Sequence, residues 1–130
     1  MAHTTLERER IEEGIRNITP QDRLVLTAVA LLEAEEETPS RTKHVYERYS
    51  QLCDALSMDG LHQRSVRDHL QDLAMQGILD TDRRQGGLQG GDYFVFSLNT
   101  PLQMTVNVLS ESERYQNHGI DEVLSVAMQR

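Results

Sequence analysis

The sequence predicts a mainly α-helical domain with one small β-hairpin, and three observations along its 130 residues support this. Apolar residues recur at helical spacing in three consecutive segments between residues 19 and 76. A short turn at 57–60 separates the second of these helices from the third. Two strand segments, 78–82 and 93–98, follow and flank a loop with four glycines. This order predicts a winged helix-turn-helix with flanking helices.

The first two helices are expected before residue 38. Residues 5–18 form an amphipathic helix that packs on the domain or links it to another, since three isoleucines share one stripe: Ile11, Ile15 and Ile18. The second helix begins at Pro20, whose ring suits a first helical position, after Thr19, which can cap it. We expect this helix to fray in the acidic run 33–37, because carboxylates there oppose the helix dipole.

The next two helices form the helix-turn-helix. The proline-containing segment 38–41 interrupts the helical pattern, and a helix then runs from about 43 to 56 with Thr42 as its candidate cap. After the turn, the last helix of the three covers residues 63–75. Gly77 is expected to stop it, because glycine readily adopts the left-handed conformation that ends helices.

The hairpin and the C-terminal segment complete the pattern. The loop 83–91 between the strands carries four glycines and two arginines, and we expect it to be mobile. In the second strand apolar residues alternate at Phe94, Phe96 and Leu98. Residues 102–115 are expected to form one helix, and residues 120–128 a last short helix that docks on the domain.

The charge balance is unusual for a nucleic-acid binder. The chain has 13 basic and 21 acidic residues and a net charge of −8, and Lys43 is its only lysine. An acidic, lysine-poor composition is similar to that of proteins from salt-loving archaea, in which carboxylates keep the protein solvated and salt screens their field. The positions of the arginines therefore say more about partners than the net charge does.

The composition also bears on the cellular location. No apolar run approaches the roughly 20 residues of a membrane span, and the first residues do not resemble a signal peptide. The single cysteine, Cys53, cannot form an internal disulfide, which favours a reducing, cytoplasmic setting.

The helix over residues 63–75 is the candidate recognition helix. If Val66, Leu70 and Leu73 point inward, polar side chains on the other face can read base edges, arginine pairing with guanine and glutamine with adenine. The alternative is a solvated polar face whose arginines pair with acids such as Asp68, and spacing alone does not separate the two interpretations. The adjacent loop favours DNA, because glycine permits close backbone approach and arginine suits phosphates and the minor groove. The predicted DNA-binding residues are Lys43, Gln63, Arg64, Ser65, Arg67, Gln71, Arg83, Arg84, Gln85, Gly86 and Gly87.

Other chemistries lack their motifs. A nucleotide-binding Walker loop needs lysine directly after glycine, and the only lysine lies far from any glycine. The five histidines and one cysteine have no metal-ligand spacing, and no catalytic triad is readable. We therefore predict no catalytic residue, no metal and no cofactor in this chain.

The sequence resembles the C-terminal domain of archaeal origin-recognition and cell-division-control replication initiators over roughly residues 6–110. The resemblance lies in the runs Val45–Tyr49, Leu52–Cys53, Leu61–Val66 and Leu70–Leu79, and in Ile18–Gln21 before Leu24–Leu26. Residues 9–12 resemble the last lid helix of the AAA+ module that precedes this domain in the family. The resemblance implies a parent with an AAA+ ATPase module, ATP and magnesium, of which this chain is an excised part.

The resemblance also implies partners and roles. The recognition helix would enter the major groove of double-stranded origin DNA, and the wing would contact the backbone or minor groove. The AAA+ module and the replicative helicase would be protein partners. We expect a linker helix from the AAA+ lid at 1–18, the winged-helix DNA-binding domain at 19–100, and helices packed on it at 101–130. The alternatives are a winged-helix transcription regulator, in which 102–128 could form a dimer helix, and a winged helix used only for protein contacts.

Overall fold

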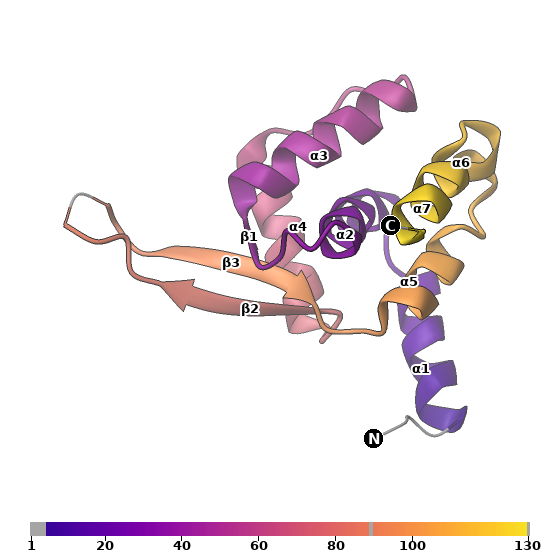
Figure 1. Ribbon diagram of the computed structural model, residues 1–130, viewed down its shortest axis with the longest axis horizontal. Helices are drawn as coiled ribbons and strands as arrows, with labels where there is room; N and C mark the ends of the chain where they lie inside the picture. The colour runs from indigo at the N-terminus through magenta and orange to yellow at the C-terminus, as the bar shows by residue number, and fades with distance from the viewer. Residues whose placement is uncertain (1–4, 89, 130) are drawn as a thin grey trace.

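The computed structural model describes residues 5–88 and 90–129 (Figure 1). The expected segments 1–18, 83–91 and 101–130 each include residues outside these ranges, namely 1–4, 89 and 130. In chain order the elements are α1 (Thr5–Arg16), α2 (Pro20–Ala34), β1 (Ser40–Arg41), α3 (Thr42–Ala55), α4 (Gln63–Met75), β2 (Leu79–Arg84), β3 (Tyr93–Leu98), α5 (Leu102–Leu109), α6 (Glu113–Asn117) and α7 (Ile120–Met128). The predicted mainly α-helical winged helix-turn-helix with flanking helices is confirmed.

Helix α2 is the centre of the core. Its start is as predicted: the side chain of Thr19 accepts a hydrogen bond from the Asp22 amide at 3.1 Å, and Pro20 occupies the first turn. Every residue from Leu24 to Leu32 is buried, because α3, α4, α5, α7 and β3 surround the helix. A helix buried on nearly all sides supplies the fixed surface on which the other elements are oriented.

Helix α2 ends at Ala34, inside the acidic run as predicted, and two carboxylates of that run have partners. Both carboxylate oxygens of Glu35 accept hydrogen bonds from the guanidinium of Arg48 at 2.6 Å. Glu33 accepts a hydrogen bond from the amide of Leu98 at 2.9 Å. These contacts compensate the unfavourable position of the two acids at a helix C-terminus and tie α2 to α3 and β3.

The segment between α2 and α3 contains a strand that the sequence analysis missed. Ser40 and Arg41 pair with Phe96 and Val95, so that β1 forms the edge of a small antiparallel sheet of order β1-β3-β2. Thr42 was expected to cap α3, and this was wrong. The extended backbone of Arg41 makes it the N-cap residue, and Thr42 already lies inside the helix.

The hairpin is longer on its first strand than predicted. Strand β2 runs to Arg84, which pairs with Tyr93, so Arg83 and Arg84 belong to the strand and not to the loop. The pairing of β2 with β3 extends past the part of the sheet that the helices cover, so the hairpin projects from the domain (Figure 1). We call this hairpin, residues 79–98, the wing. Phe94 is 37% exposed, because it lies on this projecting part.

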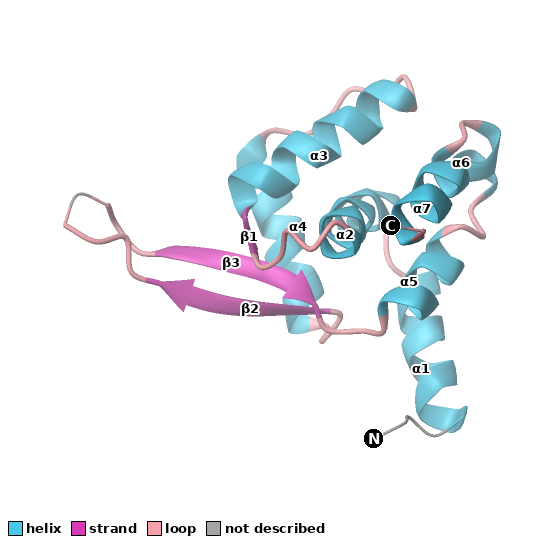
Figure 2. Cartoon of the chain, in the orientation of Figure 1, coloured by secondary structure: helices cyan, strands magenta, loops and turns pink. Residues whose placement is uncertain are grey.

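The C-terminal segment folds into three helices. One helix was expected over 102–115, but α5 ends at Leu109 and α6 begins after Ser112, whose hydroxyl caps it by accepting a hydrogen bond from the Tyr115 amide. Helix α7 is as predicted. The hydroxyls of Tyr115 and Thr27 are 2.8 Å apart inside the core and tie this segment to α2. Figure 2 shows the helices α5–α7 at the end of the molecule opposite the wing.

Candidate nucleic-acid interface

Helix α4 presents one face to the core and the other to solvent, as the spacing predicted. Val66, Leu70 and Leu73 are fully buried. The same inner side carries His69, whose Nδ1 lies 2.6 Å from the carboxylate of the buried Asp22 on α2. Burial raises the pKa of Asp22, although its hydrogen bond with His69 opposes the rise. Three apolar side chains and one polar contact therefore fix the rotation of α4 about its axis.

The turn before α4 is held by Tyr49 of α3. The Tyr49 hydroxyl accepts a hydrogen bond from the Leu61 amide at 3.0 Å and donates one to Gln21 Oε1 at 2.9 Å. Burial raises the pKa of Tyr49 to about 12, so the hydroxyl keeps its proton at neutral pH. A Cβ atom at Gly60 would lie 3.3 Å from the Tyr49 ring, which shows how closely the turn packs on it. The start of α4 is thus fixed to α2 and α3.

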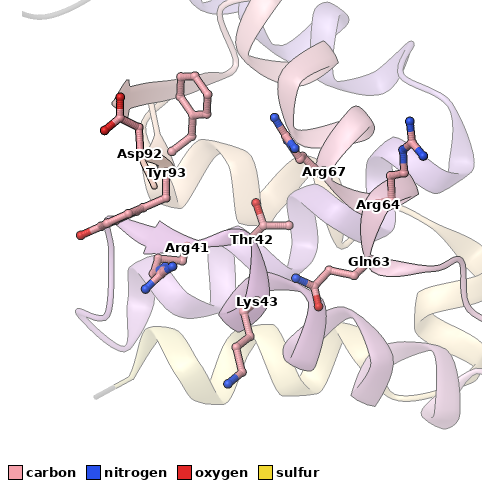
Figure 3. Close-up of a pocket in the computed structure, with 9 residues that line it drawn as sticks. Arg41, Thr42, Lys43, Gln63, Arg64, Arg67, Asp92 and Tyr93 are labelled. Atoms are coloured by element: carbon pink, nitrogen blue, oxygen red, sulfur yellow. The ribbon is translucent and has the colours of Figure 1, made fainter. Parts of the chain in front are cut away.

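A groove of about 400 Å³ lies between the first turns of α3 and α4 and the start of β3 (Figure 3). We call it the α3–α4–β3 groove. Figure 3 shows Arg41 beside Tyr93 on the wing side, with Gln63, Arg64 and Arg67 on the α4 side. It is lined by Arg41, Thr42, Lys43, Gln63, Arg64, Arg67, Asp92, Tyr93 and Phe94.

The groove concentrates positive charge in an acidic chain. Four of its lining residues are cationic and one is acidic, whereas acidic residues outnumber basic residues 21 to 13 in the whole chain. Within residues 5–88 and 90–129, none of the four cationic side chains forms an ion pair with a carboxylate. The acidic residue, Asp92, is paired with Arg83 of the wing. Its charge is therefore partly compensated, and the groove can attract a polyanion.

The structure brings together four of the eleven residues predicted to bind DNA. Lys43, Gln63, Arg64 and Arg67 are exposed and line the groove. Ser65 and Gln71 are only half-exposed and lie outside it, although Gln71 was expected to face solvent with the others.

The wing residues predicted to bind DNA are not among those that line the groove, although Arg83 contacts its edge through Asp92. Arg83 and Arg84 are exposed, but Arg83 pairs with Asp92, and Arg84 Nε lies 3.1 Å from a carboxylate oxygen of Asp82. Gln85, Gly86 and Gly87 lie in the loop at the wing tip. A Cβ atom at Gly86 would come within 2.2 Å of the backbone oxygen of Gly91, so glycine is required where the two arms of the loop meet.

Sequence reasoning missed five residues that line the groove: Arg41, Thr42, Asp92, Tyr93 and Phe94. Arg41 lay in a segment treated only as a breaker, and a two-residue strand leaves no periodicity to detect. The guanidinium carbon of Arg41 lies 4.1 Å from the centre of the Tyr93 ring, a cation–π contact. The one available signal was the alternation in β3, which places Tyr93 on the opposite face from Phe96.

Two structural findings bear on the other predictions from the sequence. Among the described residues, no three His, Cys, Asp or Glu side chains lie close enough together to hold a metal ion. No helix in the described ranges has the length and apolar character needed to cross a bilayer.

Comparisons with known proteins identify relatives of the chain. Residues 13–108 match the family described as CDC6, C terminal winged helix domain. The chain is 42% identical over 110 residues to ORC1-type DNA replication protein 15 of Haloarcula marismortui, and 41% identical over 112 residues to ORC1-type DNA replication protein 10 of Halobacterium salinarum. Each match covers 85% of this chain and 27% of the relative. The chain thus spans about a quarter of the length of these curated relatives.

A solved structure has the same fold. The ORC1 protein of Aeropyrum pernix, determined in complex with DNA, superimposes with a TM-score of 0.77 at 28% sequence identity. The match covers 86% of this chain and 29% of that protein. The predicted resemblance to archaeal replication initiators, and to those of halophiles in particular, is confirmed. The chain belongs to the family of CDC6 C-terminal winged-helix domains.

Proposed function

We propose that this domain binds double-stranded origin DNA during the initiation of replication. The N-terminal part of α4 would lie in the major groove, where Gln63, Arg64 and Arg67 can reach base edges. The wing would lie along the backbone or in the minor groove. The observation that carries the proposal is the α3–α4–β3 groove, because unpaired cations gather there in a chain whose net charge is −8.

Two further points support DNA as the ligand. The Aeropyrum pernix relative was solved with DNA, and its fold agrees with this one over 86% of the chain. The rotation of α4 is fixed by buried contacts on its inner side, so its polar side chains are held in place before DNA arrives. Preorganised contacts lose less entropy on binding. Family membership favours a role in replication over a free-standing transcription regulator or a protein-only adaptor.

We also propose that the parent protein carries an AAA+ ATPase module upstream, with ATP and magnesium, and acts in the cytoplasm with the replicative helicase as a partner. Residues 1–18 would connect that module to the winged-helix domain at 19–100, and residues 101–130 would support the domain. The length of the curated relatives, of which this chain spans about a quarter, leaves room for such a module.

The test uses two duplexes. One is selected from a random-sequence pool by the wild-type domain, and the other is a shuffled version of the same composition. Arg64→Ala and Arg67→Ala should each weaken binding to the selected duplex by about 1–3 kcal/mol more than binding to the shuffled one. Arg114→Ala on α6 removes the same charge outside the groove and should have little effect on either. Equal losses on both duplexes would contradict base reading by α4, and a selection in which the wild-type domain retains no duplex would contradict DNA binding itself.

A further inference from the structure

Arg41 is the cationic groove residue whose side chain lies over an aromatic ring. Its guanidinium carbon lies 4.1 Å from the centre of the Tyr93 ring. Its backbone belongs to β1 and is paired with Val95 of β3, so both ends of the side chain are fixed to the same strand. Arg41 is also the N-cap residue of α3. The stack therefore lies where the root of the wing meets the first helix of the helix-turn-helix.

The environment of Arg41 differs from that of the wing arginines. Arg83 and Arg84 pair with aspartates of the wing. Arg41 has no carboxylate partner among the described residues and stacks on a ring that is only half-buried. A guanidinium stacked on an aromatic face keeps its in-plane N–H groups available, and these match two oxygens of a phosphate. Stacking also limits the rotamers of a long, flexible side chain, so little freedom remains to be lost on binding.

The position of Arg41 favours a phosphate over a base. In helix-turn-helix proteins the first helix crosses the sugar–phosphate backbone while the second enters the major groove. Here α3 is the first helix, and Arg41 lies on the wing side of the groove, across from the α4 side chains that can reach bases (Figure 3). A duplex seated against α4 would bring a backbone strand past Arg41.

We propose that Arg41, oriented by the Tyr93 ring, binds a backbone phosphate of the DNA and so sets the position of the duplex relative to α4. This inference rests on the proposed function. Arg41 is the contact, and Tyr93 is a positioning residue that acts through it. The contact carries no sequence information, because a phosphate is the same at every base pair.

The test titrates the selected and shuffled duplexes over a tenfold range of potassium chloride. Arg41→Ala should weaken binding to both duplexes by the same factor, roughly tenfold, the low end for a hydrogen bond to a charged group. It should also make the log–log salt dependence shallower by about one phosphate contact, about 0.9. Arg41→Lys should keep the salt dependence but bind more weakly, because lysine lacks the planar fork.

The role of Tyr93 is tested by a double-mutant cycle. Tyr93→Phe keeps the ring and should bind like the wild type, whereas Tyr93→Leu should weaken binding about two- to fivefold. In the Arg41→Ala background Tyr93→Leu should have no further effect, because its target is absent. Melting temperatures of all variants show whether each has folded, and affinity is compared only at temperatures below melting.

Four outcomes would overturn the inference. Arg41→Ala could bind like the wild type, or lose affinity only for the selected duplex, which would indicate a base contact. Tyr93→Leu could weaken binding equally with and without Arg41, which would mean that the ring does not act through the arginine. In these three cases wild-type binding remains, so the proposed function stands. Failure of the wild-type domain to retain any duplex in the selection would overturn both.

Discussion

Tyr49→Phe removes a single oxygen atom from the contact that fixes the start of α4. The lost hydroxyl accepts a hydrogen bond from the Leu61 amide at 3.0 Å and donates one to Gln21 Oε1 at 2.9 Å. Both partners are half-buried, so water can replace the lost bonds only in part. Each orphaned group costs about 1 kcal/mol under such conditions, and the free energy of unfolding should fall by about 1–2 kcal/mol.

This loss is measurable by thermal denaturation in molar potassium chloride. For a domain of this size each kcal/mol shifts Tm by roughly 3–5 °C, so Tyr49→Phe should melt roughly 3–10 °C below the wild type. Its affinity for the selected duplex should also fall, because the turn before α4 is held less firmly.

Tyr46→Phe is the matched control for this prediction. The Tyr46 ring stacks on that of Tyr49 with centroids 6.3 Å apart, and its hydroxyl has no hydrogen-bond partner among the described residues. Its removal should change stability by less than about 0.5 kcal/mol. If Tyr49→Phe were as stable as Tyr46→Phe and bound DNA equally well, the role assigned to the Tyr49 hydroxyl would be refuted.

Three further predictions concern pH, the anchor of α4 and the charge of the groove. Burial raises the pKa of Tyr115 to about 12 in the folded protein, whereas the pKa of tyrosine in the unfolded chain is about 10. The free energy of unfolding is therefore unaffected by this group below about pH 10 and falls as the pH rises from about 10 toward 12. The urea midpoint should accordingly be lower at about pH 11 than at about pH 8. His69→Ala removes the hydrogen-bond partner of the buried Asp22 carboxylate and should reduce the free energy of unfolding, measured by urea denaturation, by about 1–3 kcal/mol. The control is His62→Ala, which removes an exposed ring that makes no capping hydrogen bond and should leave the free energy of unfolding unchanged. Asp92→Asn removes the one carboxylate of the groove and should tighten duplex binding roughly two- to fivefold in fluorescence anisotropy, with Glu122→Gln on α7 as an inert control; weaker binding by Asp92→Asn would contradict the electrostatic argument.

The helices and the recognition face could be predicted from the sequence because local patterns determine them. The Thr19 cap, the buried residues of α4 and the left-handed Gly77 after it all follow from spacing and residue type. The exposed positions of Gln63, Arg64 and Arg67 followed in turn, since the inward positions were fixed.

Two of the parts that were missed depend on contacts distant in sequence, and a third depends on a local cap. Arg41 and Tyr93 meet only because β1 pairs with β3 across more than fifty residues, and a two-residue strand has no periodicity of its own. The acidic end of α2 is held by Arg48, a partner that local helix rules do not reveal. The break in the expected helix 102–115 depends on the Ser112 cap, a local feature that the apolar spacing concealed.

The most direct test of the central claim, that duplex DNA lies across the α3–α4–β3 groove, is an NMR titration of the isotope-labelled domain with the selected duplex. Backbone and side-chain resonances of Arg41, Lys43, Arg64 and Arg67 should shift most, with smaller changes along the wing. Resonances of α6 and α7, at the opposite end of the molecule, should stay in place (Figure 1). Shifts confined to α6 and α7 with an unchanged groove would contradict the account.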